Sequence, residues 1–322
     1  MDIETKVENK KEKKKMSKRK KRILTVILVI VLLIVGIYGS IIWKFYSGIA
    51  KVVPEDQVDS TAADVQIAAK DQKDDEVINI LLVGTDTRDP DAEVGRSDTM
   101  MLVSFNKSQN KTTVASFLRD SLVEIDGHGK SKLGHTYAYG GVGLTINTIN
   151  QNYDLDIQNY ITISFDNLVS VIDEIGGVNV YISQEEADYY RQTGIMDVEE
   201  GEVTLTGSQA LSHARNRTLG RDFERTRRQR SVMYGVYKKI MEEKDPKALL
   251  PLIEFAMGQV KTNMTITEIY DLAKDVLAID NLKLQQAAIP KDGTYEDARY
   301  EGMDVLKIDF DANIEYLHQL LY

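Results

Sequence analysis

The most apolar part of the chain is a run of twenty-one residues without a charge, ILTVILVIVLLIVGIYGSIIW, at positions 23–43. At about 1.5 Å per residue a helix of this length spans roughly 30 Å, the thickness of the hydrocarbon core of a bilayer. Eleven basic and four acidic residues precede it, whereas the thirteen residues after it hold only two basic ones. This asymmetry predicts one transmembrane helix with a cytoplasmic tail, 1–22, and an extracellular C-terminal part. A cleavable signal peptide is disfavoured, because its apolar core is shorter, about 7–15 residues, and no A-x-A-like site follows.

Beyond the anchor, a polar segment, 44–76, reads as an extracellular stalk, and the pattern then changes to short apolar runs and helical periods. The runs that predict strands are 78–84, 99–106, 112–118, 160–165, 178–182 and 282–289, the second and third joined as a hairpin. The segments that predict helices are 144–153, 167–175, 208–214, 222–244, 247–260, 265–278 and 311–321. A glycine-rich loop is expected at 127–143. This alternation predicts a layered α/β domain over 77–322, with a mixed sheet inside and helices outside.

Composition excludes several kinds of site. The chain has no cysteine and four histidines without an HExxH spacing, which argues against thiol catalysis and zinc. The tail up to position 22 has a net charge of +7, but the part from Lys44 onward has 29 basic and 46 acidic residues and a net charge of −17. An acidic domain of this kind is not a general nucleic-acid binder, so any concentration of arginine within it requires another explanation.

The first candidate cluster is GTDTRDPDAEVGRSDT, 84–99, between two predicted strands. Asp86 follows the first strand and Asp98 immediately precedes the second. If the strands are neighbours, the two carboxylates face each other and suit Mg²⁺, which takes one or two protein carboxylates and fills its octahedron with water and phosphate oxygens. An ordinary polar loop, rich in Asp because Asp favours turns, explains the same residues equally well.

The second cluster is LRDS, in which Arg119 and Asp120 follow the third predicted strand. A loop at the end of a strand is the usual place for sites in α/β sheets. By itself an Arg-Asp pair is more often a surface ion pair of little consequence.

The third cluster is ARNRTLGRDFERTRRQR, 214–230, which holds seven arginines in an acidic domain. The planar, permanently charged guanidinium matches phosphate and pyrophosphate, and we favour an anion site. The spacing places Arg221, Arg225 and Arg228 on one helical face with Gln229 beside them, while Arg227 and Arg230 point elsewhere and are expected to be solvated. A helix covered with ion pairs is the alternative, but only two acids lie near enough to pair with seven arginines.

At these residues the chain resembles the LytR-CpsA-Psr family of cell-wall enzymes of Gram-positive bacteria. The segments that carry the resemblance lie in one order between about 77 and 239: NILLVGTDTRD…GRSDTMMLVSFN, SFLRDSLVEI, GKSKLGHTYAYGG, FDNLVSVIDEIGGVNV, LTGSQALSHARNR and RDFERTRRQR. The resemblance implies a three-layer α/β/α fold with a mixed central sheet and a buried channel for a polyprenyl chain. It also implies transfer of a glycopolymer from undecaprenyl pyrophosphate onto peptidoglycan, which leaves a phosphodiester link.

The resemblance assigns roles to residues of all three clusters. Those implied to be catalytic are Asp86, Asp98, Arg119 and Asp120. Asp86 and Asp98 would hold Mg²⁺, for which Mn²⁺ could substitute. Those implied to bind or approach the pyrophosphate are Arg88, Arg96, Arg119, Arg215, Arg217, Arg225, Arg228 and Gln229. Asp98 or Asp120 would orient or deprotonate the acceptor hydroxyl.

Two dipeptides and two single residues depart from the family pattern. Phe117-Leu118 stands where Ile-Pro is usual, and Gly134-His135 where Asn-Ala is common. His213 replaces an aromatic residue, and Glu224 often corresponds to glycine. We expect an acid beside the pyrophosphate site to weaken lipid binding.

The leading hypothesis is therefore a membrane-anchored, Mg²⁺-dependent glycopolymer phosphotransferase. Its partners would be the undecaprenyl-pyrophosphate-linked polymer, a teichoic acid, capsule or similar chain, together with peptidoglycan and membrane lipid, and no nucleic acid. Two other hypotheses remain open, a regulatory module that senses polyprenyl phosphate (members of the family were long labelled transcriptional attenuators) and a lipid pyrophosphatase.

Overall fold

A computed structural model describes residues 67–68, 73–85, 97–220, 222–243, 245–279 and 282–322. The predicted tail, the anchor and most of the stalk lie outside these residues. Within the described part, no helix is both long and apolar enough to cross a bilayer.

The centre of the domain is a six-stranded mixed sheet with the strand order β10-β3-β2-β1-β6-β9. The strands are β1 (Val77–Thr85), β2 (Ser97–Asn106), β3 (Lys111–Phe117), β6 (Asn159–Ser164), β9 (Val260–Thr262) and β10 (Lys283–Ile289). β1 pairs with β6, and β3 with β10, in parallel, and the other neighbours are antiparallel. The predicted mixed sheet and the β2–β3 hairpin are confirmed.

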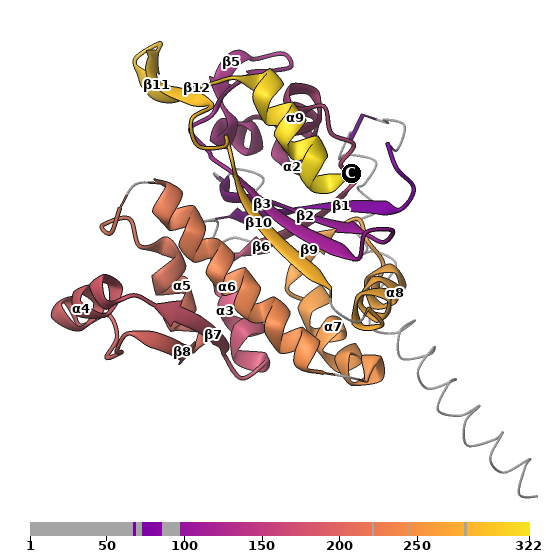
Figure 1. Ribbon diagram of the computed structural model, residues 1–322, viewed down its shortest axis with the longest axis vertical. Helices are drawn as coiled ribbons and strands as arrows, with labels where there is room; N and C mark the ends of the chain where they lie inside the picture. The colour runs from indigo at the N-terminus through magenta and orange to yellow at the C-terminus, as the bar shows by residue number, and fades with distance from the viewer. Residues whose placement is uncertain (1–66, 69–72, 86–96, 221, 244, 280–281) are drawn as a thin grey trace, which may run out of the picture. The chain divides into compact units, whose positions relative to one another are not determined.

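Helices cover both faces of the sheet (Figure 1). One face carries α2 (Thr136–Tyr153) and α9 (Phe310–Leu321). The opposite face carries α3 (Phe165–Glu174), α5 (Gly207–Arg215), α6 (Asp222–Glu242), α7 (Leu250–Met257) and α8 (Ile266–Leu277). The expected α/β/α layering is thereby confirmed.

Smaller elements connect these layers. Three two-stranded sheets pair β4 (Leu122–Ile125) with β5 (Gly129–Lys132), β7 (Val178–Ile182) with β8 (Gly201–Leu205), and β11 (Tyr295–Tyr300) with β12 (Met303–Ile308). The other helices of the described part are η2 (Leu133–His135), α4 (Gln184–Thr193) and η3 (Pro246–Leu249).

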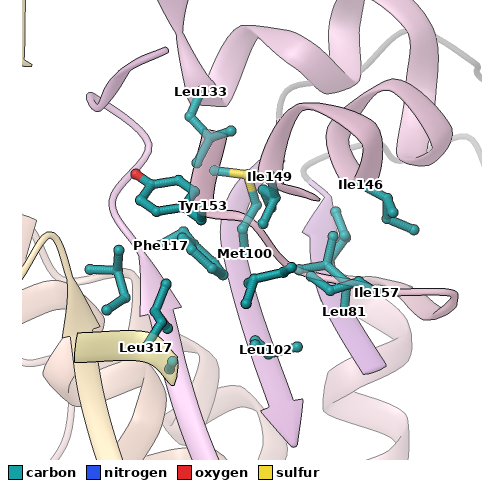
Figure 2. Packing of buried hydrophobic residues seen from close by; sticks show 14 of the residues in the cluster. Leu81, Met100, Leu102, Phe117, Leu133, Ile146, Ile149, Tyr153, Ile157 and Leu317 are labelled. Atoms are coloured by element: carbon teal, nitrogen blue, oxygen red, sulfur yellow. The ribbon is translucent and has the colours of Figure 1, made fainter. Parts of the chain in front are cut away.

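The core beneath α2 and α9 follows from the period-two pattern of the strands. Leu81 on β1 and Leu102 on β2 are fully buried on this face, together with Phe117 of β3. Tyr153 of α2 packs its ring 5.1 Å from that of Phe117, and Leu317 of α9 closes the cluster (Figure 2). The alternate residues of β1 and β2 point to the other face, where they line a cavity.

Two sequence predictions were wrong in detail. The expected glycine-rich loop, 127–143, contains β5, η2 and the first turns of α2, which kinks at Gly140 and Gly141 instead of starting after them. Gly141 has a positive φ of 62°, which a glycine adopts without steric cost, so the helix direction changes there. The expected helix 247–260 is divided into η3, α7 and β9.

Gly207 shows how closely the helices under the sheet are packed. It opens α5 directly after the N-cap Thr206, and a Cβ built on it would lie 2.2 Å from the carbonyl oxygen of Val169 in α3. We expect Gly207→Ala to lower the free energy of unfolding by about 2–4 kcal/mol, because backbone atoms of α3 would have to move. Denaturant titration measures this. Gly258→Ala, at an exposed position with a helical φ of −71°, should change stability by less than about 0.5 kcal/mol, and an equal loss in both variants would contradict the packing argument.

Candidate functional site

The loop after β3 is held in place by backbone hydrogen bonds from three directions. The Gly134 amide donates to the Arg119 carbonyl at 2.8 Å, and the Leu306 amide of β12 donates to the Asp120 carbonyl at 2.9 Å. The Leu118 amide donates to the Ile289 carbonyl of β10 at 2.8 Å. A Cβ at Gly134 would lie 3.0 Å from that of Arg119, so the small residue here leaves room for the arginine. The loop that carries Arg119 and Asp120 is therefore held in one conformation by backbone hydrogen bonds, unlike an isolated ion pair on the surface.

The side chains of this loop meet those at the start of α6. Arg119 Nε lies 3.8 Å from Asp222 Oδ1 and 3.9 Å from Asp120 Oδ2. Arg225 Nη2 lies 2.7 Å from the same Asp222 oxygen, and Lys132 Nζ donates to Asp120 at 2.7 Å. Burial raises the pKa of Asp222, although the charges of Arg225 and Arg119 oppose this shift. The second and third clusters thus form one site in which carboxylates hold cationic side chains in place.

Asp222 and Lys132 were not singled out from the sequence. Asp222 was considered only as a partner of helix arginines, although an acid in the first turn of a predicted helix is a common N-terminal feature. Lys132 comes from β5, inside the segment that was expected to be a loop.

Other predicted residues extend the site toward the sheet. The Arg215 guanidinium lies 4.7 Å above the ring of Phe165, the first residue of α3. Arg217 is exposed and close enough to Asp222 to lower its pKa against the effect of burial. Gln229 is only 7% exposed and lies one helical turn beyond Arg225. These residues come together as expected, while their assigned role in pyrophosphate binding stays a prediction.

Arg228 does not share the direction of Arg225. It is 1% exposed, and its Nη2 donates to the carbonyls of Asn216 and Leu219 at 2.7 and 2.8 Å, while Nη1 lies 3.5 Å from Glu186 Oε1. Arg228 therefore holds the loop that carries Arg217. A structural role explains its burial, and direct contact with a pyrophosphate remains a prediction.

Arg227 and Arg230 were expected to be solvated, and the structure agrees for Arg227 only. Its guanidinium is 44% exposed and pairs with Glu224 and Glu186 at 2.7 Å each. Arg230 departs from the expectation, because its Nε and Nη1 are buried without a hydrogen-bond partner among the described residues. Burial lowers the pKa of Arg230, and the nearby charge of Arg227 adds to this effect.

An apolar cavity of about 310 Å³ lies beneath this cluster. Its walls come from the strands β1, β2, β6 and β9 and from the helices α3, α5, α6, α7 and α8, together with η3. Among the described residues that line the cavity, Thr99, Arg215 and Gln229 are polar, and the others are apolar side chains or glycine. The cavity therefore shares two residues with the arginine cluster and is otherwise suited to a hydrocarbon.

Of the first cluster, 84–99, the structure describes the ends of the two flanking strands, β1 and β2. Asp86, Arg88 and Arg96 lie outside the described residues, and of Asp98 only the backbone, in β2, is described. Thr85 pairs with Ser97 across β1 and β2, so the residues that precede the two aspartates are cross-strand partners. This confirms that the strands are neighbours, and the donor set of two carboxylates fits Mg²⁺. Within the described residues alone, no group of three or more acids or histidines could hold a metal.

The family departures have clear structural settings. Phe117 and Leu118 are both buried in the core under the loop. Glu224 pairs with Arg227 at 2.7 Å, so its charge is compensated on the helix surface. His213 is fully buried, and its Nδ1 lies 2.8 Å from the Tyr190 hydroxyl.

His213 gives the fold a specific pH dependence. Burial lowers its pKa to about 4 from 6.5, against the opposing charge of Glu186. Between these values the unfolded chain binds a proton that the folded chain does not, so stability should fall as the pH drops from 6.5 to about 4. The loss should not exceed about 3 kcal/mol, and His213→Phe should flatten the slope. Denaturant titration at several pH values measures it. His128→Phe, at an exposed position, should keep the wild-type slope, and a slope unchanged in His213→Phe would contradict the assignment.

Comparison with known proteins identifies the family. A family model described as the LytR_cpsA_psr family matches residues 43–315. The chain belongs to the LytR_cpsA_psr family.

Relatives of known name and structure agree with this assignment. A polyisoprenyl-teichoic acid–peptidoglycan teichoic acid transferase TagU of Bacillus cereus (strain AH820) is 36% identical over 222 residues, which cover 68% of this chain and 70% of the relative. A protein of the same name from Enterococcus faecalis (strain ATCC 700802 / V583) is 30% identical over 239 residues, 72% of this chain and 76% of the relative. The solved structure of TagT bound to LIIa-WTA is 25% identical, with a TM-score of 0.65 over 80% of this chain and 94% of that one. The LytR_cpsA_psr fold predicted from the sequence is confirmed.

Proposed function

We propose that this LytR_cpsA_psr protein transfers a glycopolymer from a polyprenyl-pyrophosphate carrier onto peptidoglycan. One observation carries the proposal: the apolar cavity of about 310 Å³ shares Arg215 and Gln229 with the arginine cluster. A hydrocarbon that ends in an anionic head group is the ligand that fits both parts. The names of the relatives, teichoic acid transferases, support this substrate class.

The chain's own residues would act on the phosphates. The acceptor hydroxyl would attack the phosphorus that carries the glycan, the bond from that phosphorus to the bridging oxygen would break, and polyprenyl phosphate would leave. Arg119 and Arg225, held by Asp222, are already oriented, so they can stabilise the added charge without reorganising. Arg215 lines the cavity, and we propose that its guanidinium would contact the head group of a lipid bound there.

The acceptor proton needs a base beside this centre. Asp120 is a candidate, because its carboxylate faces Arg119 and is fixed by the ammonium group of Lys132. Asp98 is the other candidate named from the sequence. Either would take the proton of the sugar hydroxyl as the new phosphodiester forms.

A divalent cation completes the proposal. Asp86 and Asp98 would hold Mg²⁺, or Mn²⁺ in its place, which would neutralise charge on the pyrophosphate. The predicted helix 23–43 would anchor the protein with its catalytic domain outside the cell, where a membrane-bound donor is within reach.

The test uses full-length protein purified in detergent. We expect a polyprenyl pyrophosphate, with or without its glycan, to co-purify and to be seen by mass spectrometry of the extracted lipid. Transfer to peptidoglycan should require Mg²⁺ and should be lost in Asp86→Ala, which distinguishes an enzyme from a lipid-sensing module. Binding without any turnover would favour the sensing role, and absence of lipid binding would contradict the proposal.

A further inference from the structure

An exposed pair of stacked rings lies near the loop that carries Arg119 and Asp120. Within the described part, Tyr139 is one of three large hydrophobic residues that are exposed at the surface, with an exposed fraction of 46%. Its ring stacks on that of His128, with the ring centroids 4.5 Å apart and an angle of 14° between the planes. His128 is exposed in the turn between β4 and β5, and Tyr139 belongs to the first turn of α2. The mechanism proposed above does not use this aromatic pair.

A short bonded segment joins the aromatic pair to the transfer site. Lys132, the last residue of β5, donates to the Asp120 carboxylate at 2.7 Å. The Ser131 hydroxyl beside it lies 2.9 Å from Nδ1 of His135, whose ring meets the Tyr139 ring edge-on at 5.9 Å. At about 3.3 Å per residue, the turn at the far end of the four-residue strand β5 is roughly 10 Å from Lys132. A chain of a few sugar rings covers this distance.

The geometry of phosphoryl transfer decides from which side the acceptor approaches. The attacking and leaving oxygens lie roughly in line, on opposite sides of the phosphorus. In the proposed reaction the leaving group is polyprenyl phosphate, whose hydrocarbon would fill the apolar cavity on the face of the sheet covered by α3, α5, α6, α7 and α8. The acceptor hydroxyl therefore has to arrive from the direction of the opposite face.

The β4–β5 hairpin and the start of α2 lie on that opposite face (Figure 1). Val123 and Ile125 of β4 are buried in the same hydrophobic cluster as α2 and α9, together with Leu133 of η2. The exposed turn of this hairpin is consequently on the acceptor side of Asp120. Because the acceptor is a polymer, the sugars next to the reacting one have to lie on the surface that adjoins Asp120.

We propose that the His128–Tyr139 pair binds a sugar ring of the peptidoglycan acceptor, a few sugars along the glycan strand from the reacting hydroxyl. The inference rests on the proposed function. A pyranose ring presents a flat face of C–H bonds, which packs on the electron-rich face of an aromatic ring. The glycan strand would run from Asp120 along β5 to the aromatic pair, so the reacting hydroxyl is held at the base while its neighbours are bound on the surface.

Steady-state kinetics of the full-length protein in detergent separate the acceptor from the donor. Tyr139→Ala should raise the half-saturating concentration of peptidoglycan by about tenfold and change that of the lipid donor by less than about twofold. His128→Ala should act in the same direction with a smaller effect, because Tyr139 keeps its ring. Tyr181→Ala removes a tyrosine of β7 that is 52% exposed and lies outside this surface, so this control should change neither value.

Tryptophan fluorescence measures binding of the sugar without turnover. Trp43 is the one tryptophan of the chain, so Tyr139→Trp combined with Trp43→Phe leaves a single indole, at the aromatic pair. This variant keeps an aromatic face and should retain the wild-type half-saturation for peptidoglycan. Titration with a soluble oligosaccharide of N-acetylglucosamine should shift its emission to shorter wavelength, whereas Tyr181→Trp in the same background should show no shift.

The outcomes separate this inference from the proposed function. Wild-type kinetics for peptidoglycan in Tyr139→Ala, or no emission shift in Tyr139→Trp, overturn the acceptor surface while the function stands. A loss confined to the donor, or equal for donor and acceptor, also overturns it, because the pair would then hold the transferred glycan or only stabilise the hairpin. If the wild-type protein transfers no glycan to peptidoglycan, the proposed function fails, and this inference fails with it.

Discussion

Replacing Arg119 by alanine should lower the rate of glycopolymer transfer by about 10²–10³-fold, the effect of removing one preorganised charge-stabilising donor. Arg119 lies between Asp120 and Asp222, and its loop is fixed by β10, β12 and Gly134. The guanidinium is therefore in place before the charge develops on the leaving phosphate. Turnover measured with saturating donor and acceptor reports this effect, and the affinity for the lipid should fall much less than the rate.

Arg299→Ala is the control for this variant. Arg299 is an exposed arginine of the β11–β12 hairpin, and its Nη2 lies 3.4 Å from the Gly302 carbonyl oxygen. The same charge is removed from the protein surface, so a loss of rate there would point to a general electrostatic effect. Wild-type turnover in Arg119→Ala would remove this residue from the proposed mechanism.

Filling the apolar cavity should abolish tight binding of a polyprenyl lipid. Ala273 of α8 lines the cavity, and a tryptophan there would occupy much of its volume of about 310 Å³. We expect Ala273→Trp to weaken binding of polyprenyl pyrophosphate by more than about a hundredfold, because the buried hydrocarbon contributes roughly 0.8 kcal/mol per CH₂ group. Titration with a fluorescent polyprenyl pyrophosphate measures the loss.

Two controls accompany the cavity experiment, a tryptophan at a nearby exposed position and a measurement of stability. Ala278, five residues further along the chain, is exposed and follows the end of α8, so Ala278→Trp should bind the lipid as the wild type does. Because the tryptophan of Ala273→Trp enters open space, the variant should unfold at a denaturant concentration close to that of the wild type. Unchanged lipid affinity in Ala273→Trp would show that the hydrocarbon binds elsewhere.

The hydrophobic pattern of the sequence was sufficient to predict most strands of the central sheet and several of the helices that cover it. The apolar run at 78–84 and its neighbours on the chain predicted β1, β2, β3, β6, β7 and β10, since a buried strand needs a short apolar run between turns. The helices α3, α6, α8 and α9 were also found, because each has one apolar face. The hairpin β11–β12 was missed, because its strands YEDARY and MDVLKI mix charged and apolar residues without a continuous apolar run, and only Val305 is buried.

The site was only partly accessible to sequence reasoning, because its geometry depends on residues far apart in the chain. The charge concentration at 214–230 predicted an anion site, but helical spacing could not show that Arg228 turns toward Asn216 and Leu219. Asp222 was seen as an acid near the arginines, yet its contact with Arg119, more than a hundred residues earlier, follows only from the fold. The cavity could not be predicted from any single segment, since residues of four strands and of several helices line it together.

The central claim is the transfer reaction itself, and the most direct measurement follows both of its products. Full-length protein would be incubated with a polyprenyl-pyrophosphate-linked glycan, Mg²⁺ and peptidoglycan, and the released lipid and the modified peptidoglycan would be analysed by mass spectrometry. We predict one polyprenyl monophosphate for each glycan attached through a phosphodiester, and no release of lipid without peptidoglycan. Release of inorganic phosphate, or of polyprenyl phosphate without an acceptor, would contradict this account and identify a pyrophosphatase instead.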